Sequence, residues 1–171
     1  MLGINLLFAG FALTLNGVSY IKPVDNNAKG IANILVGTIL AINAIFQTHQ
    51  ATEYFHFGFA AGGWLFALNY IIIGAHTLVK ATNWNVFGIY SLFATIVSLV
   101  FAVDILMLAG GRLTIMSYMW LMWALLWAQS FFAILLNIKA IDKFTPHILI
   151  INGIASTFVP GLLILLGRIL L

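Results

Sequence analysis

Residues 85–103 read Asn-Val-Phe-Gly-Ile-Tyr-Ser-Leu-Phe-Ala-Thr-Ile-Val-Ser-Leu-Val-Phe-Ala-Val, without a charged side chain. A run of this kind is long enough to cross a bilayer as one α-helix, which takes about 20 apolar residues. Similar runs stand between the other charged residues, and the six expected spans are 2–20, 31–48, 58–79, 85–108, 113–136 and 147–167. The alternating segments of a membrane β-barrel are not found. The sequence therefore predicts an all-α integral membrane protein.

The composition excludes most other classes of protein. Hydrophobic residues make up 63% of the chain, charged residues only 6%, and the mean hydropathy is +1.12. A soluble domain averages about a quarter charged residues. The net charge of +3 comes from seven basic and four acidic residues, which is no signal for a nucleic-acid partner. The chain has no Cys, which excludes thiolate metal sites and cysteine catalysis.

We expect residues 1–171 to form a single transmembrane domain. The first span has no basic segment before it and no small-residue cleavage site, so it is interpreted as a helix of the mature protein rather than a signal peptide. No phosphate loop, nucleophile elbow, zinc-protease motif or dinucleotide fingerprint is present. We therefore expect neither an enzyme nor a resident cofactor or metal.

The loops after the first, third and fifth spans hold most of the basic residues, namely Lys22, Lys29, Lys80, Lys139 and Lys143. The opposite side holds Arg112 and Arg168. The positive-inside rule then places those three loops in the cytoplasm and both termini outside. Lys22, Lys80 and Lys139 each begin a similar turn, with an Asp or Asn three residues later that suits the cap of the next helix. Their spacings of 58 and 59 residues favour three helical hairpins in a pseudo-threefold ring around a pore.

Bulky and polar side chains share faces of four spans at helical spacing. The residues of these faces are Leu6, Ala9, Leu13 and Asn16 in the first span, Phe66, Asn69 and Tyr70 in the third, Trp120, Trp123, Leu126 and Trp127 in the fifth, and Asn152 in the sixth. One interpretation is packing between helices, with interhelical amide hydrogen bonds worth about 0.6–2 kcal/mol. The other is an aromatic slot for a flat, neutral, polar solute, since indole faces stack and indole N–H groups donate. Small residues are dense in the first three spans, which predicts close helix packing; they include Gly10, Gly17, Gly37, Gly58, Gly62, Gly63 and Gly74, of which Gly58 and Gly62 form a small-xxx-small pair.

The chain resembles the AmiS/UreI family of urea and amide channels over essentially its whole length. The matching stretches are Met1-Leu2-Gly3, Leu13, Asn16-Gly17, Val24-Asp25, residues 63–70 (Gly-Trp-Leu-Phe-Ala-Leu-Asn-Tyr), residues 90–93, residues 120–127 (Trp-Leu-Met-Trp-Ala-Leu-Leu-Trp), residues 143–146, Gly153 and Pro160. The resemblance implies three hairpins around a channel, a hexameric ring with a lipid-filled centre, and a pore lined by most of the residues named above.

Two departures from the family pattern bear on acid gating. Acid-gated members have a long outer loop rich in His and carboxylates, whereas the loop expected here, residues 48–57, offers only His49, Glu53 and His56 for pH sensing. Gated members also carry a Glu at the position of Asn152. The resemblance thus favours a channel without acid gating, placed in the inner membrane beside a cytoplasmic urease or amidase.

The predicted function is passive conduction of urea and short aliphatic amides. Ionisable groups inside a span mark proton or ion paths, and Asp104 is the only carboxylate in one. A proton-coupled transporter would need Asp104 or His76 to titrate. A non-transporting membrane subunit stays open as a second alternative, and a bis-His haem or metal protein as a third.

Overall fold

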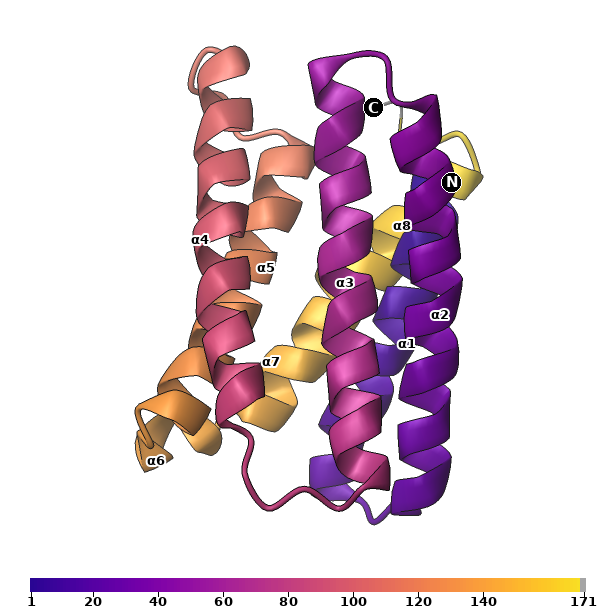
Figure 1. Cartoon of the computed structure of the whole chain (residues 1–171). Helices are drawn as coiled ribbons and strands as arrows, with labels where there is room; N and C mark the ends of the chain where they lie inside the picture. The colour runs from indigo at the N-terminus through magenta and orange to yellow at the C-terminus, as the bar shows by residue number, and fades with distance from the viewer. Residues whose placement is uncertain (170–171) are drawn as a thin grey trace.

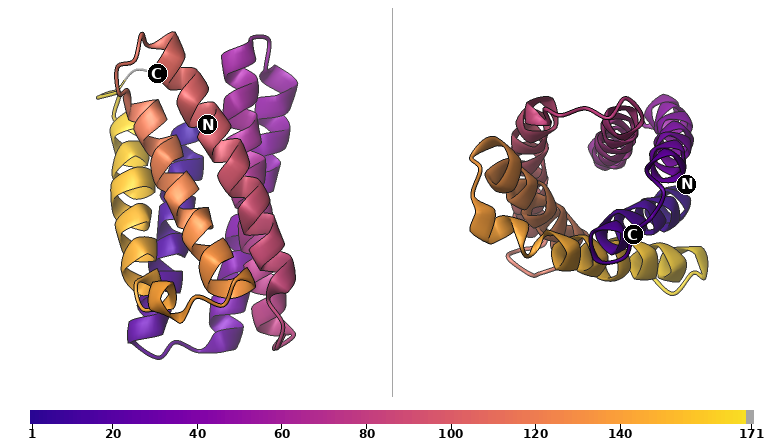
Figure 2. Two further views of the ribbon diagram at one scale, coloured as in Figure 1. Left: turned by 90° about the vertical axis from the view of Figure 1, so that its left-hand side faces the viewer. Right: turned by 90° about the horizontal axis from the view of Figure 1, so that it is seen from below.

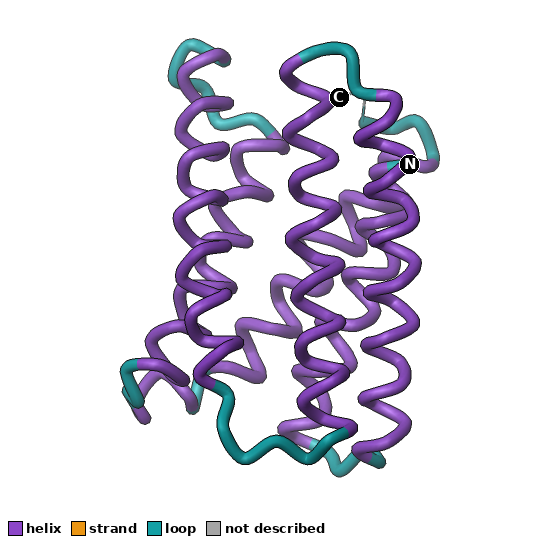
Figure 3. The backbone as a smooth tube through the Cα atoms, viewed as in Figure 1, coloured by secondary structure: helices purple, strands orange, loops and turns teal. Residues whose placement is uncertain are grey.

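The computed structural model describes residues 1–169, except for the side chains of residues 54 and 55. The described chain is helical apart from short turns (Figures 1 and 3). Its elements are α1 (Leu2–Ile21), α2 (Asn26–Gln50), α3 (Tyr54–Leu78), α4 (Asn85–Leu108), α5 (Ile115–Ser130), the π-helix η1 (Phe131–Leu135), α6 (Lys139–Asp142), α7 (Thr145–Ile151), the π-helix η2 (Asn152–Phe158) and α8 (Val159–Leu165). Six helical units are long and apolar enough to cross a membrane, which confirms the predicted all-α fold with six spans.

The fourth span has the predicted bounds, whereas the second and third begin earlier than expected. Helix α2 starts at Asn26 instead of residue 31, because the Asp25 carboxylate caps it by accepting from the Ala28 N–H at 2.8 Å. Helix α3 starts at Tyr54, so the outer loop predicted at residues 48–57 shrinks to residues 51–53. Helices of this length extend beyond a hydrocarbon core of about 30 Å. Their polar ends therefore lie in the interface, where hydropathy does not reveal them.

The spans form a ring when viewed along the helix axes (right-hand view of Figure 2). The most extensive packing is between α2 and α3, between α4 and α5, and between α1 and the last span, α7–η2–α8. Within an 18-residue window of each span, 50%, 50% and 44% is buried in the first, third and fifth spans, against 33%, 22% and 33% in the second, fourth and sixth. Odd-numbered spans therefore line the inside of the ring and even-numbered spans cover them. This alternation supports the predicted pseudo-threefold repeat, which stays a prediction.

Glycines at seven-residue spacing bring the paired backbones together. A Cβ on Gly10 would lie 2.7 Å from the Gly153 carbonyl oxygen, and a Cβ on Gly37 would lie 2.9 Å from the Ala67 carbonyl oxygen. The close packing predicted from the glycines is therefore found at Gly10 and Gly37, whereas Gly58 and Gly62 lie against aromatic side chains of α4 and α5 rather than against a backbone. The seven-residue period, which matches nearly parallel helix crossings, is the better signal.

The three Lys-containing turns differ more than their sequences suggest. Asp25 caps α2, and Asn83 accepts from the Asn85 backbone N–H at 2.7 Å near the start of α4. Asp142, expected to cap the last span, lies in the separate short helix α6, and α7 begins with Thr145 and Pro146. The cap prediction is wrong there because α6 is inserted between the two spans.

Candidate functional site

A cavity of about 600 Å³ opens at the end of the ring that carries the Lys-containing turns. We call it the inner vestibule. Its mouth is bordered by turn residues such as Asn83 and Asn137, and its deep end by residues near the middle of the spans, among them Leu13, Asn69 and Trp127. The vestibule thus runs from one face of the protein to about half its depth.

Three buried amide side chains border the vestibule, and each is held by another helix. Asn16 exchanges two hydrogen bonds of 2.9 Å with Asn33 of α2. Asn69 accepts from the Trp127 indole N–H at 2.9 Å, which joins α3 to α5. Gln129 accepts from the Thr145 hydroxyl at 2.8 Å, which joins α5 to α7. These amides serve as interhelical hydrogen-bonding groups and also give the vestibule an uncharged polar wall.

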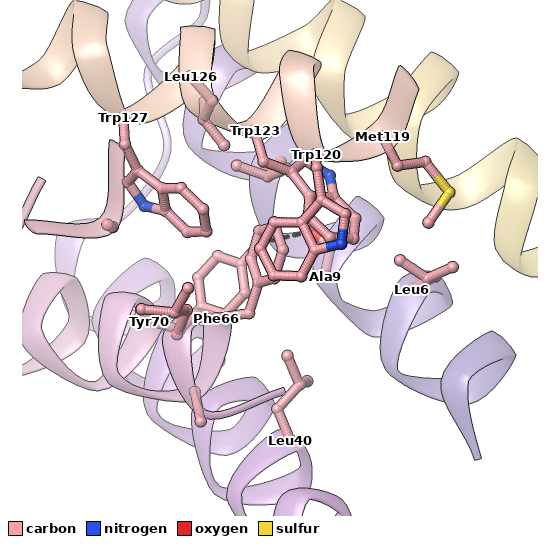
Figure 4. Close-up of a cluster of buried hydrophobic side chains, with 14 of the residues drawn as sticks. Leu6, Ala9, Leu40, Phe66, Tyr70, Met119, Trp120, Trp123, Leu126 and Trp127 are labelled. Carbon is pink, nitrogen blue, oxygen red and sulfur yellow. Dashed lines mark hydrogen bonds between the residues drawn. The ribbon is translucent and has the colours of Figure 1, made fainter. Parts of the chain in front are cut away.

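A cluster of buried aromatic rings (Figure 4) includes Trp127, which borders the deep end of the vestibule. The Phe66 ring lies 4.9 Å from that of Trp123 in an edge-to-face arrangement and 5.0 Å from that of Trp127. Trp120 follows, 5.0 Å from Trp123. The Tyr70 hydroxyl donates to the Ala9 carbonyl oxygen at 2.7 Å and so ties α3 to α1 beside the cluster. We call Phe66, Tyr70, Trp120, Trp123 and Trp127 the aromatic constriction.

A second, small cavity of about 20 Å³ lies on the other side of the constriction. We call it the outer cavity. It is lined by Asn5, Leu6, Ala9, Phe59, Phe66, Met116, Trp120 and Trp123, among others. A neighbouring cavity of similar size shares Phe59, Met116 and Trp120 and reaches Asp104. The two ends of the protein are thus separated chiefly by side chains of the constriction.

The structure brings most of the predicted path residues together. Leu13, Asn16, Asn69, Leu126 and Trp127 border the vestibule. Leu6, Ala9, Phe66, Trp120 and Trp123 border the outer cavity, and Tyr70 is buried between the two groups.

Asn152 does not join this set. Its Nδ2 donates to the Ile148 carbonyl oxygen at 3.1 Å, and its Oδ1 accepts from the Ser156 hydroxyl at 3.1 Å. The hydroxyls of Ser156 and Thr157 also donate to the Asn152 carbonyl oxygen in the π-helical turn. A π-turn disturbs the regular backbone ladder, and side chains must satisfy its polar groups inside a membrane. The Asn152 side chain therefore serves the backbone of its own helix.

The three residues expected to sense pH lie apart from the path. His49, Glu53 and His56 are exposed at the end of the ring opposite the Lys-containing turns, around the short α2–α3 loop. None of the three lines the vestibule or the outer cavity.

The partners that hold the buried amides in place were not predicted from the sequence. Asn33, Gln47 and Thr145 bind Asn16, Asn5 and Gln129, respectively. Asn16 and Asn33 are nearly equidistant from the turn at residues 22–25. This symmetry predicts the contact between Asn16 and Asn33, because residues of antiparallel neighbouring helices meet at equal distances from the turn that joins them.

Comparison with known proteins agrees with this architecture. Residues 1–168 match the AmiS/UreI family of transporters. The acid-activated urea channel of Helicobacter pylori is 27% identical over 195 aligned residues, covering 96% of this chain and 97% of that protein. A Mycolicibacterium smegmatis protein described as a transporter of amidate substrates is 24% identical, over 97% of this chain and 77% of its own length.

Solved structures extend the likeness to the fold. The crystal structure of the urea channel from Helicobacter pylori has a TM-score of 0.82 at 26% identity, covering 99% of this chain and 100% of that one. A cryo-EM structure of the same channel in a closed state has a TM-score of 0.78 at 24% identity, with the same coverage. The predictions of a multi-pass membrane protein and of a non-enzymatic function are confirmed. The chain belongs to the AmiS/UreI family of membrane transporters.

Proposed function

We propose that this protein is a channel that conducts urea and short aliphatic amides passively, down their concentration gradient. The observation that carries the proposal is the alignment of the inner vestibule, the aromatic constriction and the outer cavity along one ring of helices. The names of the relatives, a urea channel and an amidate transporter, support the same class of solute.

The chemistry of the path suits a small, flat, neutral solute. Urea and acetamide carry N–H donors and a carbonyl acceptor, which the amides of the vestibule can match in part. At the constriction the solute sheds some of its water, and contact with the indole faces of Trp123 and Trp127 replaces part of that hydration. Multiple weak contacts favour throughput over tight binding.

We further propose that the channel is not gated by acid. Gating would require titratable groups that act on the path, and His49, Glu53 and His56 are exposed at its outer end. At the position of Asn152, where the resemblance implies a Glu in gated members, this chain has an amide that is committed to its own helix.

The arrangement in the membrane is also a proposal. The basic residues of the Lys-containing turns support a vestibule mouth in the cytoplasm and both termini outside the inner membrane. We propose a homohexamer with a lipid-filled centre, which delivers its solute to a cytoplasmic urease or amidase. These statements rest on the distribution of basic residues and on the family resemblance.

Stopped-flow light scattering on proteoliposomes tests the proposed function. Urea, acetamide and glycerol are compared at about pH 5 and about pH 7.5, the range over which histidine titrates. We expect rapid, non-saturating urea or acetamide flux at both pH values. Accumulation against a gradient driven by protons would instead indicate a coupled transporter, and flux only at the lower pH would refute the ungated channel. A folded protein without any flux would favour a non-transporting subunit.

A further inference from the structure

Two residues that border the outer cavity each carry a buried polar atom that has no hydrogen-bond partner in the described part of the chain. The two atoms are the amide oxygen Oδ1 of Asn5 and the indole Nε1 of Trp123. Asn5 is 4% exposed and Trp123 is 2% exposed. An unpaired buried polar group destabilises a protein and calls for an explanation. Here one atom is an acceptor and the other a donor, on α1 and α5 respectively.

Asn5 differs from the other buried amide side chains of the described chain. The oxygens of Asn16 and Asn33 accept from each other. Those of Asn69, Gln129 and Asn152 accept from Trp127, Thr145 and Ser156. An amide that served only to join helices would use its oxygen in the same way. Asn5 instead keeps its acceptor unused beside a cavity.

Gln47 fixes the direction in which the Asn5 amide points. The Nδ2 of Asn5 donates to the Gln47 Oε1 at 3.2 Å, so the nitrogen end is held by α2. Gly63 of α3 makes room for this pair, since a Cβ there would lie 3.1 Å from the Gln47 Oε1. At the preceding Gly62, a Cβ would lie 3.3 Å from the Trp120 ring. The two glycines thus let the amide pair and the indoles approach α3 at consecutive positions.

We propose that Asn5 and Trp123 form an outer binding station for urea and primary amides. A solute N–H donates to Asn5 Oδ1, and the solute carbonyl oxygen accepts from Trp123 Nε1. Gln47 acts as a positioning residue that keeps the acceptor turned toward the cavity. The station rests on the proposed function, and it makes the Asn5–Gln47 pair a determinant of solute selectivity.

The size of the outer cavity indicates when the station is used. Its volume of about 20 Å³ accommodates about one water molecule. A solute the size of urea fits only when a bordering ring, such as that of Phe59 or Trp120, moves aside. The station would then offer both of its hydrogen bonds to a solute that has lost water on its way to the constriction. Amides would therefore bind there better than solutes that cannot donate and accept together.

The first test observes the Trp123 N–H directly in the wild-type protein. The chain has five Trp residues, so selective ¹⁵N-tryptophan labelling gives a sparse spectrum in which Trp123→Phe identifies the relevant signal. We expect this signal to shift on titration with urea or acetamide, and to stay in place with glycerol at the same concentration. No response of this signal in protein that conducts urea would overturn the station while leaving the proposed channel intact.

The second test compares variants by proteoliposome flux. Asn5→Leu keeps the side-chain shape but removes the acceptor, and we expect urea permeability to fall about twofold to tenfold, as the loss of one hydrogen bond implies. Gln47→Leu should give a smaller fall. Thr48→Val is the matched control, because it removes a hydroxyl from the neighbouring position of α2 that does not border the cavity. Wild-type permeability in folded Asn5→Leu would refute the station. Absence of amide flux in the wild type would refute the proposed function and the station with it.

Discussion

Replacing Phe66 by Ala is the most direct perturbation of the aromatic constriction. The Phe66 side chain is 3% exposed and borders the outer cavity, and its ring contacts Trp123 and Trp127. Trp127 in turn borders the inner vestibule. Removing this ring takes away a side chain that stands between Trp127, at the vestibule, and the outer cavity. We expect Phe66→Ala to raise the permeability to urea and to weaken the discrimination against larger solutes such as glycerol.

The expected magnitude follows from the contacts that the ring makes. For a solute to pass, the ring must swing out of its two pairings with Trp123 and Trp127, at centroid distances of 4.9 and 5.0 Å. Aromatic pairs are worth about 0.5–1.5 kcal/mol each, so the movement costs about 1–3 kcal/mol. Removing that cost from the barrier corresponds to an increase in permeability of about 5-fold to 150-fold. The same truncation is expected to lower the free energy of unfolding by about 3–5 kcal/mol, as for other buried Phe residues.

Stopped-flow light scattering on proteoliposomes measures both effects when urea and glycerol are run on the same vesicles. Phe11→Ala is the matched control, because Phe11 lies on the outward face of α1 and is 53% exposed. We expect the control to conduct like the wild type. If Phe66→Ala folds, as judged by its elution as the native oligomer, and its urea and glycerol permeabilities equal those of Phe11→Ala, then the ring does not limit passage and the constriction is misplaced.

Three further predictions concern the packing that holds the path. Gly10→Ala places a carbon 2.7 Å from the Gly153 carbonyl oxygen and should lower the free energy of unfolding by about 1–3 kcal/mol. Gly58→Ala meets only a ring edge at 3.2 Å and should lower it less. Thermal unfolding in detergent compares the two variants, and equal losses would contradict the packing argument. Asn33→Leu should lower the free energy of unfolding by about 0.6–2 kcal/mol. Adding Asn16→Leu should lower it little further, because the two amides bind each other. Additive losses in a double-mutant cycle would show that the two amides act independently. Tyr70→Phe should lower stability by about 0.5–1.5 kcal/mol through loss of its bond to the Ala9 carbonyl, and an unchanged unfolding temperature would exclude that contribution.

Hydropathy was enough to predict the number of spans because the bilayer imposes it. A helix that crosses the hydrocarbon core must be apolar for about 20 residues, and six runs meet that condition. The starts of α2 and α3 could not be predicted in this way, since polar residues such as Asn26 and His56 are equally compatible with a helix or a loop in the interface. The short helix α6 was not predicted, for the same reason.

Helical periodicity predicted most of the candidate path because inward faces recur every three or four residues. It placed Leu6, Ala9 and Leu13 on one side of α1, and the structure turns that side to the interior. Periodicity cannot tell what an inward polar side chain will bind. Asn152 shares a depth with the path, yet its amide satisfies a π-turn that the sequence does not reveal. Asn5 lies just beside the predicted face of α1 and was not predicted to line the path, but it borders the outer cavity.

The positions of the charged side chains favour a path that excludes ions because its middle part has no charged groups. Among the described residues that border the three cavities, the charged side chains are Lys29 and Asp142 in the vestibule and Asp104 at the outer end. The residues between them offer amides, indoles and aliphatic groups. Moving an ion into such surroundings costs several kcal/mol, and each 1.36 kcal/mol slows passage about tenfold. A neutral amide loses only part of its hydration and regains hydrogen bonds at the walls. On the proposed function, a stretch of path without charged side chains is therefore enough to discriminate between urea and an ion, without a gate.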